Sequence, residues 1–342
     1  MRQSVTIEPG HMEIQDAPEP VAGSGQAVVR IEAVGLCGSD YHLFLGDHPY
    51  ANFPLRQGHE LAGTIESLAD DYDGPRKVGE RVAIEPLIPC GTCFPCRHGH
   101  YNACASLKVI GAHVAGGLVD KLAVSASALF PAGDLSPELT ALCEPMSIGC
   151  QAISRGRVTA DDTVVVIGAG PIGQAVLLGS KERGAHVLVA DRIASRLELA
   201  KEFGADVVVD TTTTDLATEV KRWTEGEGAA VVMEATGSPE VIRLAVDLVA
   251  ASGIIVVIGL SDREVSIPVI EFTRKELNIL GSRNNAGLFG EAVELVKRNR
   301  DRIGSLITHT CTLEEVPEVI RFAVDHPEQV EKVIVLFGDQ AK

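Results

Sequence analysis

Four cysteines with short spacers form a group whose chemistry is apparent from the sequence. The pattern C-x2-C-x2-C-x7-C brings four thiols into fifteen consecutive positions, at Cys90, Cys93, Cys96 and Cys104. Short spacers let one loop surround a single ion, and four thiolates complete a tetrahedral zinc shell that leaves no position for a substrate. We therefore predict a structural zinc site. His98 and His100 lie in the same loop, and we expect both to face solvent because the shell is already complete.

A second group of candidate ligands mixes sulfur, nitrogen and oxygen. Cys37 lies in GLCGSDYH, His59 and Glu60 lie in GHELAG, and Glu144 lies in CEPMSIG. A mixed shell with an exchangeable position is what Lewis-acid catalysis requires, so this group predicts a catalytic zinc and brings the total to two zinc ions per chain. Cys143 competes with Glu144 because thiolate is the softer ligand, but adjacent side chains point in different directions and only one can face the metal.

A glycine-rich turn predicts a dinucleotide site. The segment GAGPIG follows the strand-like TVVVI and opens a helix-like stretch, and its key positions are Gly168, Gly170, Pro171, Ile172 and Gly173. In this context the glycines let the backbone approach a pyrophosphate, and the helix N-terminus presents free N–H groups to it.

The residues after the next strand bear on the choice between NAD and NADP. Asp191 lies 23 residues after Gly168 and ends the strand-like HVLVAD. A carboxylate there accepts hydrogen bonds from the ribose hydroxyls and repels a 2′-phosphate, which favours NAD. Arg192 follows and could tolerate a 2′-phosphate, and Asp191 could instead cap the next helix. Arg196 is also expected to bind the cofactor.

These groups need two kinds of domain to position them. Up to about residue 145, short β-like stretches alternate with Gly, Pro and Asp, as in 27–35, 60–68, 81–88 and 120–130, which predicts a small antiparallel barrel-like domain. From about residue 160, apolar strands alternate with helical periods, which predicts a doubly wound parallel sheet. We expect an α/β protein with a catalytic domain at 1–145, a return of 286–342 to it, and a nucleotide-binding domain at 146–285.

Composition narrows the functional classes. The 342 residues carry a formal charge of −17, which argues against nucleic acid or an anionic membrane as a partner. The N-terminus has no signal-peptide pattern, and no segment approaches the ~18 uninterrupted apolar residues of a membrane span. We expect a cytoplasmic protein whose thiols are reduced.

In their order along the chain, CGSDxH, GHExxG, the four-cysteine lobe, EPxSxG and GAGPIG resemble the zinc-dependent medium-chain dehydrogenase/reductase family. The resemblance covers essentially the whole chain. It implies a GroES-like β-rich catalytic domain, a Rossmann domain, and zinc ligands Cys37, His59 and Glu144 or Glu60. Because Glu144 stands where liver-type alcohol dehydrogenases have cysteine, the chain is more similar to the polyol, threonine and sugar-acid branch. Threonine dehydrogenases tend to have Asp-Pro where this chain has Glu144-Pro145, which argues against that substrate.

The resemblance also implies a proton relay. Ser39 is two residues past Cys37 and would take the proton of the substrate hydroxyl, and His42 would carry it onward to solvent. Glu60 and Glu144 would alternate as water or substrate enters, and Asp40 would orient His59. The alternatives are that Ser39 caps a turn and that His42 is an ordinary surface residue.

The substrate is expected to be a hexonate oxidised at C5, with a neutral polyol as the alternative. Arg283 in GSRNN would grip the carboxylate, Asn284 would fix hydroxyls, and His113 in GAHVAGG would reach the same pocket. Arg283 could instead pair with a nearby carboxylate or the cofactor. Two other classes of protein would need a different set of residues. An inactive zinc protein would lack Ser39, Glu60 or the glycine loop, and a zinc-independent reductase would lack both ligand groups. An exposed edge strand of the parallel sheet would suit a homo-oligomer.

Overall fold

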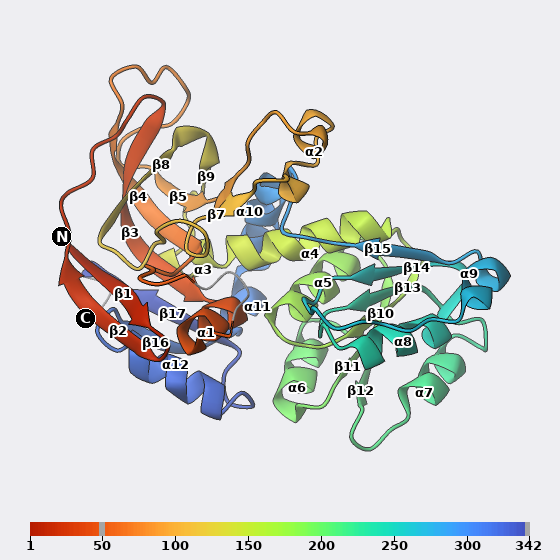
Figure 1. Ribbon diagram of the computed structural model, residues 1–342. Helices are drawn as coiled ribbons and strands as arrows, with labels where there is room; N and C mark the ends of the chain where they lie inside the picture. The colour runs from red at the N-terminus through yellow and green to blue at the C-terminus, as the bar shows by residue number, and fades with distance from the viewer. Residues whose placement is uncertain (48–51, 339–342) are drawn as a thin grey trace. The chain divides into compact units, whose positions relative to one another are not determined.

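The chain folds into two compact units (Figure 1). The computed structural model describes residues 1–47 and 52–338. The first unit comprises Met1–Glu144 together with Phe289–Lys342, and the second comprises Pro145–Leu288. The catalytic ligand candidates therefore all belong to the first unit, and the glycine-rich turn belongs to the second.

The first unit is built on a sheet of seven strands in the order β16-β17-β3-β4-β5-β9, with β8 also paired to β3. Its β17 returns from the C-terminal segment to pair antiparallel with β3. A hairpin of β1 and β2 and a short pair of β6 and β7 complete the strands. The strands span β1 (Arg2–Glu8), β2 (His11–Asp16), β3 (Gln26–Leu36), β4 (Glu60–Leu68), β5 (Arg81–Ile84), β6 (Leu87–Ile88), β7 (Lys108–Val109), β8 (Lys121–Ser125), β9 (Leu129–Pro131), β16 (Ile307–Thr312) and β17 (Lys332–Leu336).

Two segments expected as single strands are each divided. The stretch 81–88 is interrupted at Glu85 and Pro86, where proline has no N–H to donate to a ladder. The stretch 120–130 is interrupted by a 3₁₀ turn, so that β8 pairs with β3 whereas β9 pairs with β5. One chain segment therefore serves two neighbours, as at the corner of a barrel-like sheet.

The helices of the first unit are short, and they alternate along the chain with the strands or lie in the C-terminal segment. They span α1 (Gly38–Leu45), α2 (Phe94–Arg97), η1 (Tyr101–Ala103), η2 (Ala126–Ala128), α3 (Pro137–Ala141), α10 (Phe289–Arg298), α11 (Arg300–Gly304) and α12 (Val316–Asp325). Helix α4 (Cys143–Gly156) begins in the first unit and continues into the second.

The second unit is a parallel sheet in the order β12-β11-β10-β13-β14-β15, which confirms the doubly wound fold expected from the alternating pattern. Helices α5, α6 and α8 pack against its strands. The order reverses at β10, so the carboxyl ends of β10 and β13 frame the usual place for a nucleotide. The elements span β10 (Thr163–Ile167), α5 (Pro171–Glu182), β11 (His186–Asp191), α6 (Ala194–Glu202), β12 (Val207–Asp210), α7 (Leu216–Trp223), β13 (Ala229–Glu234), α8 (Pro239–Leu248), β14 (Val249–Val257), α9 (Val269–Lys275) and β15 (Asn278–Gly281).

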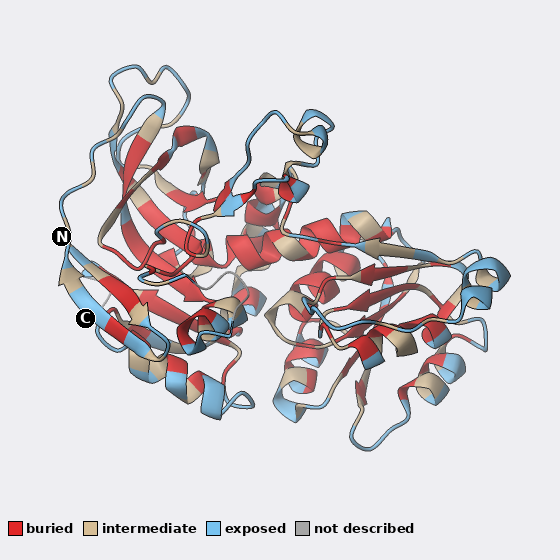
Figure 2. Ribbon diagram, viewed as in Figure 1, coloured by how far each residue is buried: buried red, intermediate tan, exposed pale blue. Residues whose placement is uncertain are grey.

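Each unit has its own apolar core, and the central strands β3 and β4 of the first unit and β10 and β13 of the second are mostly buried (Figure 2). In the first unit, Val34 and Leu61 from β3 and β4 are nearly inaccessible to solvent; in the second, Val165 and Val232 occupy the centre of the parallel sheet. Among residues 1–47 and 52–338, no helix is long and apolar enough to cross a membrane.

Candidate active site

Three side chains of the first unit converge into a compact group of metal-ligating atoms. Cys37 is the N-cap residue of α1, His59 immediately precedes β4, and Glu60 is the first residue of β4. One ligand atom from each lies within 4.8 Å of the others. His59 and Glu60 are buried, whereas Cys37 is partly exposed. The two loops expected to supply a catalytic metal site thus meet in space, and we call these three residues the trio.

Asp40 ties together the two segments that carry the trio. Its Oδ2 accepts a hydrogen bond from the backbone N–H of Cys37 (3.0 Å), and its Oδ1 accepts one from the N–H of Gly58 (3.2 Å). The side chain of Gln57 donates to the carbonyl of Asp40 at 2.7 Å. Asp40 Oδ2 lies 3.6 Å from His59 Nδ1, an electrostatic contact longer than a hydrogen bond. The carboxylate therefore fixes the backbone on both sides and faces the imidazole.

The donor set of the trio fits a zinc ion. A thiol, an imidazole and a carboxylate are all common zinc ligands, and three protein ligands leave a position for substrate. Within the described part of the chain, His59 Nδ1 and Glu60 Oε2 are buried and have no hydrogen-bond partner. Buried polar atoms are normally satisfied, so a cation here would compensate the trio.

Lys332 is a functional-site residue that the sequence analysis missed. It lies at the start of β17 with only 2% of its surface exposed. Its Nζ contacts Glu60 Oε1 at 2.6 Å and donates to the carbonyl of Leu36 at 3.2 Å. Burial alone would lower the pKa of Lys332, but the charges of Glu60, Cys37 and Glu144 raise it. The lysine therefore stays charged and balances part of the negative charge around the trio.

Glu144, and not Cys143, interacts electrostatically with this group, although in the described residues its carboxylate is not among the ligand atoms that lie within 4.8 Å of one another. Glu144 is buried in the first turn of α4, and its charge acts on both His59 and Glu60. Burial raises the pKa of Glu144 to about 7, the charges of His59 and Lys332 oppose that rise, and Glu60 adds to it. The Cys143 thiol instead lies 3.9 Å from the carbonyl of Leu139, and burial raises its pKa so that it remains a thiol.

Electrostatics around His59 favour a positive charge. Burial disfavours the imidazolium, but the charge of Asp40, a hydrogen bond with Cys37 and the charges of Cys37 and Glu144 outweigh it. Together they hold the pKa of His59 well above its ordinary value. A site that stabilises a proton on its imidazole can equally stabilise a metal ion in its place, since both are cations bound to the same nitrogen.

The side chains expected in the proton relay lie on α1. Ser39 is partly exposed in the first turn, two residues after Cys37. His42 is exposed, and its Nδ1 lies 3.0 Å from Asp47 Oδ1. The N–H of Cys37 at the start of α1 is bound by the carboxylate of Asp40 and not by Ser39.

His113 lies on a loop that packs directly beside the segment leading to His59. Gly117 donates to the carbonyl of Gly58 at 2.9 Å, and a Cβ atom on Gly111 would lie 2.4 Å from that same carbonyl oxygen. Only a glycine allows such a close approach. His113 itself is exposed, and its Nδ1 accepts a hydrogen bond from Val109 at 3.3 Å.

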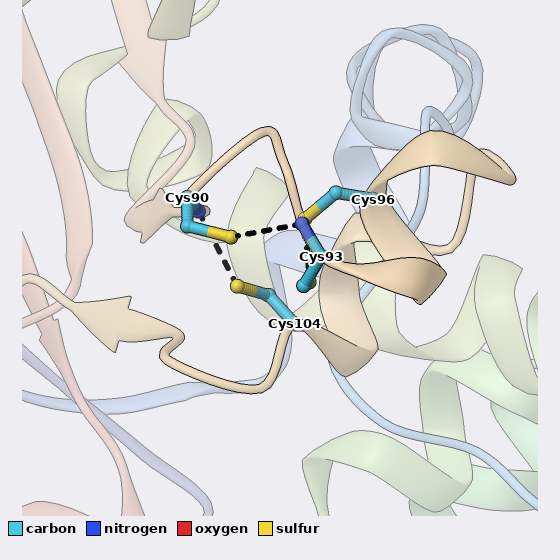
Figure 3. A group of neighbouring side chains, drawn as sticks. All are labelled: Cys90, Cys93, Cys96 and Cys104. Atoms are coloured by element: carbon cyan, nitrogen blue, oxygen red, sulfur yellow. Dashed lines mark hydrogen bonds between the residues drawn. The ribbon is translucent and has the colours of Figure 1, made fainter.

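The four-cysteine lobe is a second metal-ligating group (Figure 3). The four sulfur atoms of Cys90, Cys93, Cys96 and Cys104 lie within 4.8 Å of one another and turn inward. All four are free thiols, and Cys93 Sγ and Cys96 Sγ are 3.4 Å apart. Backbone N–H groups of Thr92 and Cys93 point at Cys90 Sγ and lower the pKa of that thiol to about 5. Four inward sulfurs without an intervening carboxylate fit a closed zinc shell.

The glycine-rich turn has the geometry of a phosphate site. Gly168 has a φ of +97°, and its N–H donates to the carbonyl of Ala190 at 2.9 Å. Gly170 caps α5, and Pro171 occupies the first helical turn. A Cβ on Gly173 would lie 1.8 Å from the carbonyl of Gly168, so the helix reaches the strand only because this residue has no side chain. Ile172 follows Pro171 in the first turn of α5.

Asp191 ends β11 and joins the turn to the next loop. Its Oδ2 accepts from Ala169 N–H at 2.6 Å, and its Oδ1 accepts from Arg192 and Ile193 N–H at 2.6 and 2.9 Å. Ile193, not Asp191, is the N-cap residue of α6. Arg196 lies beside the turn, with Nη1 3.8 Å from where a Cβ of Gly170 would be. A carboxylate and a guanidinium thus flank the turn, while Arg192 is exposed.

The remaining predicted substrate residues belong to the second unit. Arg283 and Asn284 follow β15, where Arg283 is exposed and Asn284 adopts a φ of +45°. The next residues are anchored to α4, because Ala286 N–H donates to Gln151 Oε1 at 3.2 Å.

Comparison with known proteins identifies the family. Residues 23–134 match alcohol dehydrogenase GroES-like domains, and residues 171–298 match zinc-binding dehydrogenases. An L-galactonate-5-dehydrogenase of Escherichia coli is 30% identical over 93% of this chain and 94% of its own length. A sorbitol dehydrogenase of Bacillus subtilis is 29% identical over 98% and 97%.

The solved structures agree on the fold. The rspB alcohol dehydrogenase from E. coli CFT073, determined with NADH, superimposes with a TM-score of 0.92 and 31% identity over 98% of this chain and 99% of that one. Together with the trio, the four-cysteine lobe and the glycine-rich turn, these matches establish that the chain belongs to the zinc-binding medium-chain alcohol dehydrogenases, in the branch of the polyol and sugar-acid enzymes.

Proposed function

We propose that the protein oxidises a secondary alcohol of a sugar acid or polyol to a ketone, with transfer of hydride to NAD. The observation that carries this proposal is the trio of Cys37, His59 and Glu60, a mixed and partly open ligand set within 4.8 Å. The first unit would then be the catalytic domain and the second the cofactor domain. When bound at the trio, zinc supplies a Lewis acid that polarises the substrate hydroxyl.

The residues around the trio would handle the proton. Ser39 is partly exposed, as is Cys37 two residues before it, and would accept the hydroxyl proton. His42 is exposed, its Nδ1 lies 3.0 Å from Asp47 Oδ1, and it would pass the proton to solvent.

We propose NAD as the preferred cofactor. Support comes from Asp191, whose carboxylate lies at the end of β11 beside the turn, where a 2′-phosphate would meet its negative charge. Because the backbone also depends on this carboxylate, Asp191→Asn is a better test than alanine. The expected result is a loss of NAD preference over NADP by about 10-fold, since the amide keeps an acceptor but not the charge. A wild-type preference for NADP would contradict the assignment.

Within this chemistry we propose a hexonate oxidised at C5 as the substrate. Arg283, Asn284 and His113 are the residues that would bind it. In a chain of net charge −17, an anionic substrate requires a local cation, and the L-galactonate-5-dehydrogenase relative acts on an anion of this class. A neutral polyol is the second candidate, favoured by the sorbitol dehydrogenase relative.

The experiment is a panel of aldonates and their matching alditols, scored by NADH formation. Arg283→Ala should lower kcat/KM selectively for the aldonate. Arg263→Ala is the matched control, because Arg263 is an exposed arginine of the same unit that pairs with Glu240. If Arg283→Ala lowers kcat/KM equally for the aldonate and the alditol, or if the wild-type enzyme prefers the alditol, the hexonate proposal is wrong and a neutral polyol is the better candidate.

We also propose a homo-oligomer in a reducing, cytoplasmic location. β15 is an edge strand of its sheet. Helix α9 precedes β15 in the chain and packs on β14. The structure describes all of its residues and none is buried, although Val269 and Ile270 are apolar. Edge strands with apolar neighbours favour association, and eight free cysteines suit a reducing compartment. Ile270→Glu should shift the sedimentation profile toward the monomer. A wild-type monomer would contradict this.

A further inference from the structure

The ion pair between Glu60 and Lys332 crosses an intervening strand. Glu60 lies on β4 and is paired in register with Gly35 on β3, and Gly35 is paired on its other side with Ile334 on β17. Lys332 lies two residues before Ile334 on β17. The carboxylate of Glu60 therefore reaches Lys332 only by passing over β3 near Gly35.

Gly35 leaves the space through which this carboxylate passes. A Cβ atom on Gly35 would lie 1.9 Å from Glu60 Oε2 and 3.0 Å from Glu60 Cδ. Side chains paired across adjacent strands share one face of the sheet, which explains the overlap. The backbone of Gly35 is not among the positive-φ residues of the described chain, so no turn requires glycine here. Glycine is otherwise unfavourable inside a strand, and its presence near the end of β3, at a position paired with a strand on either side, needs a reason.

The contacts of the two carboxylate oxygens supply that reason. Oε1 is held by Lys332 Nζ at 2.6 Å. Oε2 has no hydrogen-bond partner in the described residues, and Glu60 belongs to the trio with Cys37 and His59. The oxygen that a side chain at position 35 would displace is thus the oxygen left available to a cation.

We propose that Gly35 is a positioning residue which, together with Lys332, seats Glu60 so that one oxygen is anchored and the other is presented to a zinc ion held by Cys37 and His59. The inference rests on the proposed zinc-dependent function and adds a determinant of how firmly that zinc is retained. With a methyl group at position 35, Oε2 has to move, and the carboxylate can no longer serve Lys332 and the metal together.

The test is site-selective release of zinc from the purified holoenzyme to a colorimetric chelator. Gly35→Ala should release the zinc of the trio about 10-fold faster, as expected when a supporting contact of a metal ligand is lost. Zinc of the four-cysteine lobe should leave at the wild-type rate. The measurement follows metal and not turnover, so it does not depend on the identity of the substrate.

The matched control is Gly63→Ala on the same pair of strands. A Cβ there would lie 2.3 Å from the carbonyl oxygen of Arg30 and 2.6 Å from Val29 Cγ1, so it strains the sheet, and its three nearest atoms belong to Arg30 and Val29 and not to Glu60. Gly63→Ala should lower stability and leave zinc release unchanged. Equal acceleration in both variants would overturn the inference, because general loosening of the sheet would then explain the effect.

A double variant separates positioning from simple misfolding. Glu60→Ala removes Oε2 and Cδ, which would lie 1.9 and 3.0 Å from the added methyl group, and keeps only Glu60 Cβ, also at 3.0 Å. Adding Gly35→Ala to it should therefore affect folding little and should not change zinc release further. If Gly35→Ala alone fails to fold and Glu60→Ala restores folding, the contact is supported; if both fail to fold, or if the two effects add, the inference is wrong. A wild-type enzyme that carries zinc only in the lobe would contradict the proposed function itself, before any variant is compared.

Discussion

The four-cysteine lobe and the trio are two solutions to the problem of holding a metal ion in one domain. The lobe takes all its sulfurs from fifteen consecutive residues, with Cys93 capping α2 and Cys104 following η1. It has a small apolar cluster of its own around Leu87 and Leu107. The trio instead depends on segments brought together by the sheet, with Asp40 and Lys332 in support. A lobe can be built locally, whereas the trio requires the whole unit.

The two centres also differ in the direction in which the pKa values of their side chains are shifted. In the lobe, backbone N–H groups lower the pKa of Cys90 to about 5, and backbone hydrogen bonds also lower the pKa of Cys104. Around the trio, burial raises the pKa of Glu144 to about 7, and neighbouring anions raise that of His59 despite its burial. The lobe is thus partly anionic without a metal, while His59 of the trio and the neighbouring Glu144 hold protons that compete with a metal.

The largest expected effect comes from removing one histidine from each centre, which tests whether the trio is catalytic and the lobe structural. His59→Ala should lower turnover by about 1,000-fold or more and leave one zinc per subunit, because a ligand of the catalytic position is lost. His98→Ala should keep both zinc ions and full turnover, since its Nδ1 contacts only the carbonyl of Phe94 in the described residues. Metal analysis with steady-state kinetics measures both. Retained activity in His59→Ala would end the catalytic assignment of the trio.

A serine beside each centre gives the next largest contrast. Ser39→Ala should lower turnover by about 100-fold with zinc still bound, as expected for loss of a proton-transfer group. Ser106→Ala is the control, because its Oγ lies 3.8 Å from Cys104 Sγ in the lobe, and turnover should not change. If hydride transfer is shown to be rate-limiting and Ser39→Ala turns over normally, Ser39 has no part in the relay.

How far the sequence predicts each centre follows from the same difference. The ligands of the lobe are regularly spaced within one short loop, and such spacing can be read directly from the sequence. The four sulfurs of the lobe were therefore predicted to meet, and they do. The alternation of strands and helices likewise predicted the parallel sheet. The convergence of Cys37 with His59 and Glu60 was predicted from motif order and residue chemistry.

The supporting residues of the trio could not be predicted in this way. Lys332 lies 272 positions from Glu60 and looks like an ordinary charge before an apolar strand. Gly35 looks like a weak point in β3 until the cross-strand register places it opposite Glu60. The division of 81–88 and 120–130 into separate strands was also not predicted. Where such a strand ends depends on which neighbouring strand it pairs with, as β8 pairs with β3 and β9 with β5. Pairing across a sheet is long-range information that local pattern does not contain.

Chelation should sharpen the comparison through rates. A chelator can enter the open position at the trio, and Cys37 there is partly exposed, whereas four thiolates leave no vacant position. We expect loss of one zinc per subunit together with activity, at least about 10-fold faster than loss of the second, while circular dichroism remains native. A wild-type stoichiometry of one zinc, with activity retained after chelation, would defeat the two-centre interpretation.

The smallest expected effect is a change in proton release with pH when zinc is loaded at the trio. Because burial raises the pKa of Glu144 to about 7, the metal-free protein holds that proton at pH 6 and has mostly lost it at pH 8. The pKa of this carboxyl is 4.5 in the unfolded chain and about 7 in the folded one, so the folded state binds the proton more tightly. The free energy of unfolding of the metal-free protein therefore falls as the pH rises from 4.5 through 7. The raised pKa of His59 acts in the same direction, since its stabilising charge is lost as pH rises through that value.

Zinc loading should therefore relieve this cost at high pH and compete with protons at low pH. Calorimetry in buffers of different ionisation enthalpy should detect more proton release at pH 6 than at pH 8, by most of one proton. Glu144→Gln should remove most of that difference. In the lobe, Cys90 has a pKa of about 5 and Cys96 one of about 12, so neither thiol changes its protonation between these pH values. If Glu144→Gln leaves the pH dependence intact, the carboxyl of Glu144 does not carry that proton, and the trio would hold its zinc without the electrostatic coupling that separates it from the lobe.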